Sequence, residues 1–328
     1  MQKAKKERKA IGTARRKKAR DLLAVLFFLL MLPYTCSVLF GLRKENLVQT
    51  SAGAVQDEKQ GGYVLWRGKN GVLRMPVEEF LVGALAACIP AGYQPETLKA
   101  QAVILRSACR AQGAPKEQIQ REESGIAFLD ETERQKYWGD EAVEREEAFR
   151  KAVEETRGIV LAWEGEAVSP PFFRVSAGKT RDGGEIFGGQ QMAWCRSVEC
   201  PHDVEEEGFL QETRYGREEF VQRLLAEGFV LPQQGARIIL TRDGADYVIS
   251  VGCGDCYLEG EKFRKLFALP SSCFYLREEE GKIVLQTKGV GHGLGFDQYA
   301  ADLLAKEGLD YIELLDHFFE GLSLEKME

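Results

Sequence analysis

The chain has 328 residues, of which 44% are hydrophobic, so it is long enough to bury the core of one large domain or two small ones. The first 20 residues carry a net charge of +9 and the whole chain carries −7, which leaves −16 on the remainder. This acidity argues against DNA or RNA as a partner, because nucleic-acid affinity comes largely from Lys and Arg contacts to phosphates.

An uncharged segment follows the basic N-terminus. Residues 22–41 could cross a bilayer as a helix, since about 20 residues at ~1.5 Å each suffice. The positive cluster before them keeps the N-terminus in the cytoplasm and exports the rest. A cleaved signal peptide is the alternative, but the long basic stretch and long apolar run favour an uncleaved anchor. We therefore predict a basic cytoplasmic tail (1–21), a transmembrane helix (22–41), a polar linker (42–65) and an extracytoplasmic domain (66–325) of a single-pass protein of the cell membrane.

The extracytoplasmic part alternates between helical and strand patterns. A hairpin is predicted around Gly-Lys-Asn-Gly at 68–71. Helices are predicted over 76–89, 95–112, 140–157 and 216–228, and strands on both sides of Glu-Gly-Glu at 164–166, within 235–251 and over 283–290. Because strands and helices do not alternate regularly, the expected fold class is α+β, with a mostly antiparallel sheet and packed helices.

Residues 289–295, Gly-Val-Gly-His-Gly-Leu-Gly, place His292 between glycines just before an amphipathic helix. The four glycines allow positive φ angles, which would turn the chain tightly and leave His292 exposed. A dinucleotide-binding loop is disfavoured, since no βαβ unit surrounds the motif. A structural histidine that caps a turn is the alternative to a functional one.

The motif that runs from Gly289 to Tyr299, followed by "YIELLDHFFEG" with His317, resembles the signature of the SpoIID/LytB domain family. Two upstream blocks resemble the same family: "MPVEEFLVGALAACIPAGYQPETLKAQAVILRSACRA", and "FFRVSAGKT" followed by "WCRSVECPHD". The resemblance covers about residues 66–325. It implies a SpoIID/LytB-like domain that acts on peptidoglycan, as lytic transglycosylases do on glycan strands stripped of their stem peptides.

The resemblance also implies where the general acid belongs. The family has a Glu in an Ala-Ala-Glu-Met-Pro segment, whereas this chain has Cys88 within Ala-Ala-Cys-Ile-Pro. A transglycosylase must protonate the glycosidic oxygen, and a thiol, with an unperturbed pKa near 8.5 against about 4.3 for Glu, is a poor donor for that step. We therefore expect a SpoIID-like cell-wall protein that binds glycan strands in sporulation or wall remodelling, with its transglycosylase activity weakened or lost.

Several side chains retained from the family can hydrogen-bond sugar hydroxyl or acetamido groups. The resemblance implies that the substrate-binding residues are Lys179, Thr180, His292, Gln298 and Tyr299. Asp297 stands where the family has Ser, and it or Glu79 is the candidate substitute acid in the alternative hypothesis of an active lytic transglycosylase. A third hypothesis is a thiol enzyme built on Cys88. The expected partners besides glycan strands are other cell-wall hydrolases or sporulation membrane proteins.

The remaining cysteines give no firm assignment. Cys195, Cys200 and His202 lie close in sequence, but the spacing is a weak match to a zinc site. Cys253 and Cys256 have Cys-x-x-Cys spacing without the helix N-terminus of a thioredoxin-type site. Disulfides or free thiols are both compatible with these spacings. The zinc site that some clostridial relatives carry is not retained, because Phe128 and Arg134 stand at its cysteine positions, and no metal or cofactor is expected.

Overall fold

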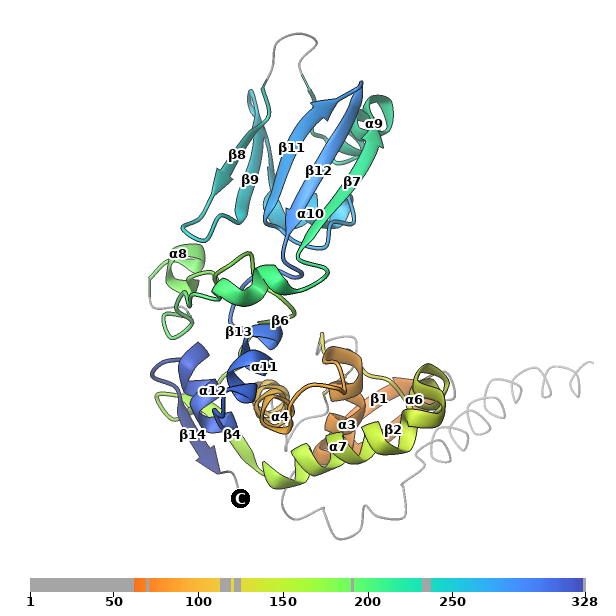
Figure 1. Ribbon diagram of the computed structural model, residues 1–328, viewed down its shortest axis with the longest axis vertical. Helices are drawn as coiled ribbons and strands as arrows, with labels where there is room; N and C mark the ends of the chain where they lie inside the picture. The colour runs from red at the N-terminus through yellow and green to blue at the C-terminus, as the bar shows by residue number, and fades with distance from the viewer. Residues whose placement is uncertain are drawn as a thin grey trace, which may run out of the picture. The chain divides into compact units, whose positions relative to one another are not determined.

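The computed structural model describes residues 62–68, 71–112, 119–120, 125–189, 192–231 and 237–326 (Figure 1). The predicted cytoplasmic tail, membrane span and nearly all of the linker lie outside these residues. In the part that is described, no helix combines the length and the apolar character that crossing a membrane requires. The chain divides into two units, residues 1–52 with 66–74 and residues 53–65 with 75–328.

The described residues of the first unit belong to β1 (Tyr63–Gly68) and β2 (Gly71–Pro76). The two strands are neighbours in a sheet, so the predicted hairpin is confirmed. The middle of its turn, positions 69 and 70, lies outside the described residues.

The second unit mixes helices and mostly antiparallel strands, which confirms the predicted α+β class for the described residues. Its helices are α3 (Val77–Cys88), α4 (Pro95–Ala111), α6 (Glu131–Trp138), α7 (Ala142–Glu155), α8 (Gly183–Phe187), α9 (Arg217–Ala226), α10 (Gly260–Leu266), α11 (Gln298–Lys306) and α12 (Tyr311–Phe318), with the 3-10 turns η1 (Gly139–Glu141) and η2 (Pro201–Glu205). Its strands are β3 (Ile119–Gln120), β4 (Ile159–Trp163), β5 (Glu166–Ala167), β6 (Phe172–Phe173), β7 (Leu210–Gly216), β8 (Ile239–Arg242), β9 (Val248–Cys253), β10 (Cys256–Glu259), β11 (Phe274–Glu279), β12 (Lys282–Lys288), β13 (Phe296–Asp297) and β14 (Ser323–Lys326).

Local signals place the helix ends near the predicted positions. Helix α3 follows Pro76 with two acidic residues in its first turn, and it ends where Ile89 becomes extended before a proline. Helix α4 has Pro95 in its first turn, where the missing N–H costs no hydrogen bond. Helix α6 was not predicted, because its eight residues are mostly polar and show no apolar stripe.

The sheets are small and mainly antiparallel. Strand orders are β10-β9-β8, β11-β12-β7 and β14-β4-β5, all with antiparallel neighbours. The exception that matters for the site is the short parallel pair β13-β6, in which Phe296 lies opposite Phe172. This pair joins the end of the glycine-rich segment to Phe172 and Phe173, which begin the motif "FFRVSAGKT".

The two larger apolar clusters among the described residues of the second unit lie on different sets of elements. One gathers side chains of α4, β4, β13, α11 and α12, among them Ile104, Phe296 and Phe318, together with buried Trp194. Figure 1 shows α11 and α12 beside α4, in agreement with the contacts between these helices. The other cluster lies among α9, α10 and strands β7, β9 and β12, where Phe263 stacks on Phe274 with ring centroids 4.8 Å apart. The helices that present the candidate site are therefore anchored in the first cluster.

Candidate functional site

The glycine-rich segment turns as predicted between β12 and α11. Gly289, Gly291, Gly293 and Gly295 all have positive φ angles, between 72° and 121°. Gly293 also allows a close approach, since a Cβ built there would lie 2.1 Å from Cζ of Tyr247. The backbone N–H of Arg181 donates to the carbonyl of Gly293, at 2.7 Å, so the block that contains Lys179 and Thr180 lies beside the segment.

His292 is held by its neighbours rather than left exposed. Its Nδ1 accepts a hydrogen bond from the backbone N–H of Leu294, at 3.1 Å, and its ring lies 5.7 Å from the ring of Phe173. Burial lowers the pKa of His292, and a hydrogen bond to the Phe172 backbone opposes that shift. Because the His292 ring is neutral and makes these contacts, the structure favours a structural role for this histidine over a functional one. Its contact with a sugar stays a prediction.

Cys88 and Gln298 are brought together although 210 residues separate them in sequence. The side-chain Nε2 of Gln298 donates to the carbonyl oxygen of Cys88 and to Oε1 of Gln101, both at 3.0 Å. The end of α3 therefore meets the start of α11, and residue 88 lies against the helix that follows the glycine-rich segment. Gln101, on α4, was not singled out from the sequence because nothing in its own neighbourhood marks it.

The Cys88 thiol is a weak acid in this position. It is partly buried, and burial raises its pKa to about 12, although a hydrogen bond from the Ala127 backbone acts in the opposite direction. At neutral pH the thiol therefore stays protonated and holds its proton tightly. Such a group is neither a good proton donor to an ether oxygen nor an activated nucleophile.

We expect iodoacetamide to alkylate Cys88 on the order of 10²–10³ times more slowly at pH 7 than an ordinary cysteine, because only the thiolate reacts. Since the pKa is raised, the rate should keep increasing with pH until the solution approaches about pH 12. Peptide-resolved mass spectrometry with free cysteine as the reference measures this. Rapid alkylation of Cys88 at neutral pH would instead support the thiol-enzyme hypothesis.

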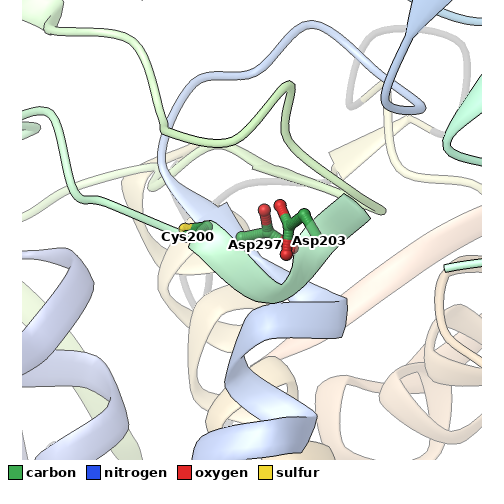
Figure 2. A group of neighbouring side chains, drawn as sticks. All are labelled: Cys200, Asp203 and Asp297. Carbon is green, nitrogen blue, oxygen red and sulfur yellow. The ribbon is translucent and has the colours of Figure 1, made fainter. Parts of the chain in front are cut away.

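Asp297 caps helix α11 and is fully buried. Its Oδ1 accepts hydrogen bonds from the backbone N–H groups of Tyr299 and Ala300, at 3.1 and 3.2 Å, and its side chain is 0% exposed. Beside it lies Asp203, which is also 0% exposed and was not singled out from the sequence (Figure 2). Burial and the neighbouring Asp203 raise the pKa of Asp297 well above its usual range. Asp297 is thus protonated more easily than an ordinary carboxylate.

The other predicted contact residues differ in accessibility. Lys179 keeps about a third of its side chain exposed and lies 3.8 Å from a carboxylate oxygen of Glu199. Thr180 is 0% exposed, and its hydroxyl accepts a hydrogen bond from the Val198 backbone at 2.8 Å. Tyr299 is partly exposed at the start of α11, and Glu79 is exposed in the first turn of α3. Of the residues predicted to bind sugar in this group, Lys179 and Tyr299 are accessible enough to touch a ligand directly, and Thr180 is not.

The cysteines at 88, 109, 195, 200, 253, 256 and 273 are all free thiols. Cys253 and Cys256 lie opposite each other where β9 turns into β10. The structure does not bring His202 to the neighbouring thiols: it is exposed, and its Nδ1 lies 3.0 Å from a carboxylate oxygen of Glu205. Cys200 instead lies near Asp203 and Asp297.

Comparison with known proteins identifies one family. Residues 67–163 match the family model SpoIID, described as "Stage II sporulation protein". The chain is 25% identical over 267 residues to stage II sporulation protein D of Bacillus amyloliquefaciens, covering 79% of this chain and 77% of that protein. It is 26% identical over 266 residues to stage II sporulation protein D of Bacillus subtilis (strain 168), covering 78% and 76% of the two chains. The resemblance inferred from the sequence motifs is therefore confirmed.

Proposed function

We propose that this chain, which matches the SpoIID family model over residues 67–163 and is similar to two stage II sporulation proteins D, binds the glycan strands of peptidoglycan and cleaves them weakly or not at all. The proposed setting is sporulation or cell-wall remodelling, with the domain held outside the cytoplasm by the N-terminal segment 22–41. Other cell-wall hydrolases or sporulation membrane proteins are the proposed partners, which the bound domain would position or stimulate.

The protonated thiol of Cys88 carries this proposal. Lytic cleavage needs an acid that protonates the glycosidic oxygen while the C6 hydroxyl of the muramyl sugar closes onto C1. The family resemblance implies residue 88 as the position of that acid, and burial raises the thiol pKa there to about 12. Loss of a general acid typically lowers the rate by on the order of 10²–10⁴. Glycan binding does not require the acid, so the protein can bind glycan strands without cleaving them.

One observation supports an active enzyme as the second candidate. The pKa of Asp297 is raised well above its usual range, which is the property a general acid needs at neutral pH. However, Asp297 is 0% exposed, and its oxygens accept backbone hydrogen bonds from Ser176, Tyr299 and Ala300. Glu79 is exposed but lies in the first turn of α3, at the other end of the helix from Cys88. Asp297 is inaccessible and Glu79 lies away from position 88, so the binding protein is the better-supported candidate.

We expect the purified full-length protein, in detergent, to retain denuded glycan strands in a sedimentation assay without generating anhydro-muramyl ends. Tyr299→Ala should weaken retention by roughly 2- to 10-fold, because a partly exposed aromatic ring is lost from the binding surface. Tyr137→Ala is the matched control, since Tyr137 is 76% exposed on α6 and should leave retention unchanged. Rapid formation of anhydro-muramyl ends by the wild type would contradict the proposal, as would a wild type that retains no glycan.

A further inference from the structure

We propose that Cys200, Asp203 and Asp297 form a buried binding site for one zinc-type divalent cation. One potential ligand atom from each residue lies within 4.8 Å of the others, and Figure 2 shows the two carboxyl groups side by side. Cys200 comes just before η2, Asp203 lies within it, and Asp297 caps α11. None of the three residues is residue 88, and the proposal does not depend on glycan binding.

The two carboxyl groups lack a charge partner. Asp203 and Asp297 are both 0% exposed, and neither forms an ion pair with a Lys, Arg or His among the described residues. Each carboxyl group raises the free-energy cost of ionising the other, because like charges repel strongly away from water. A positive charge, either a proton or a metal ion, is therefore needed between them.

One oxygen of the pair also lacks a hydrogen bond. Among the described residues no N–H or hydroxyl group donates to the buried Asp203 Oδ1, whereas Oδ2 of the same group accepts from the Ser176 backbone N–H, at 2.8 Å, and from the Ser176 hydroxyl. A buried acceptor with no partner is unfavourable, and it occurs here at the position where a cation would bind. The unpartnered atom is a second observation, independent of the clustering, that points to a ligand.

The surrounding hydrogen bonds hold the carboxyl groups in place. Asp297 Oδ2 accepts from the Ser176 backbone N–H, at 2.8 Å, and Asp297 Oδ1 accepts from the N–H groups of Tyr299 and Ala300. Each carboxylate oxygen has two lone pairs, so Asp297 Oδ1 is saturated by its two bonds, whereas Oδ2 keeps one lone pair for a metal. Metal-binding carboxylates are characteristically oriented by such outer hydrogen bonds.

The donor set selects the class of cation. A cysteine sulfur together with carboxylate oxygens suits zinc, whereas magnesium and calcium prefer oxygen ligands alone. On binding, the Cys200 thiol and any protonated carboxyl group would release their protons to solvent. The competing arrangement is a single proton shared by Asp203 and Asp297, with the Cys200 thiol donating only to the carbonyl oxygen of Val198, at 3.7 Å.

Zinc content tests the proposal directly. The full-length protein, made without a metal-affinity tag, is equilibrated with zinc chloride in detergent, passed through a desalting column and analysed by inductively coupled plasma mass spectrometry. We expect about one zinc ion per chain, and a higher melting temperature with zinc than with a chelator. Cys200→Ser and Asp203→Asn should each lose most of the bound zinc and the thermal shift. Cys256→Ser, which removes a partly exposed cysteine elsewhere, should keep both.

Circular dichroism shows whether each variant folds. If Asp203→Asn does not fold, Cys200→Ser decides the question. It replaces only the sulfur atom of a side chain that is 3% exposed, so it should leave the fold intact. A wild type that retains no zinc would overturn the proposal, as would equal zinc content in wild type and Cys200→Ser. An infrared band of a protonated carboxyl group that persists in zinc-treated wild type and disappears in Asp203→Asn would also overturn it, in favour of the shared proton.

Discussion

We expect the Cys88→Glu variant to cleave denuded glycan strands on the order of 10²–10⁴ times faster than the wild type. The substitution puts a carboxyl group where the family resemblance places the general acid, at the end of α3 and against Gln298. The partial burial that raises the thiol pKa would also raise the pKa of a carboxyl group at this position, because both lose solvation of their charged form. A carboxyl group that stays protonated near neutral pH is suited to protonate the glycosidic oxygen.

Anhydro-muramyl ends, counted by mass spectrometry, measure this gain. Cys88→Gln is the matched control, since it has nearly the same shape as Glu but no acidic proton, and it should cleave no faster than the wild type. Equal activity of the Glu and Gln variants would show that residue 88 does not supply the missing proton. A gain confined to Glu would show that the rest of the catalytic surface is intact.

The second prediction concerns the stability of the helices that carry the site. We expect Arg106→Met to lower the free energy of unfolding by about 3–5 kcal/mol, because it leaves the buried carboxylate of Glu78 without its partner. Arg106 is 4% exposed, and it donates to Glu78 Oε1 from Nε, at 2.8 Å, and to Oε2 from Nη2, at 2.7 Å. Its guanidinium also donates to the carbonyls of Val153 and Ile159, so it connects α3 and α4 with α7 and β4.

Urea unfolding, monitored by circular dichroism, measures this decrease in the free energy of unfolding. Arg145→Met is the control, because Arg145 forms an exposed ion pair with Glu141 and should cost no more than about 0.5 kcal/mol. A double variant, Arg106→Met with Glu78→Leu, should recover much of the stability, since it removes both buried charges together. If Arg106→Met is no less stable than Arg145→Met, the buried pair does not hold these helices together.

Local sequence features predicted a large part of this fold. Helices α3, α4, α7 and α9 were found from apolar spacing and end signals, because these depend on residues within a few positions of one another. The positive φ angles of the glycines around His292 were likewise predictable, since glycine tolerates a left-handed backbone without a steric cost. The exposure predicted for His292 was not found, because its ring packs against β6, more than a hundred residues earlier in the chain.

By itself the sequence determined the resemblance to the SpoIID family, through three ordered motifs, and the cysteine at residue 88, which needs no coordinates to be seen. Only the tertiary structure decided which polar groups meet: Gln298 with Cys88, and Asp297 with Asp203. The physical reason is that backbone conformation responds to near neighbours, whereas burial, and with it the raised pKa values of Cys88 and Asp297, depends on segments that packing brings together from distant positions.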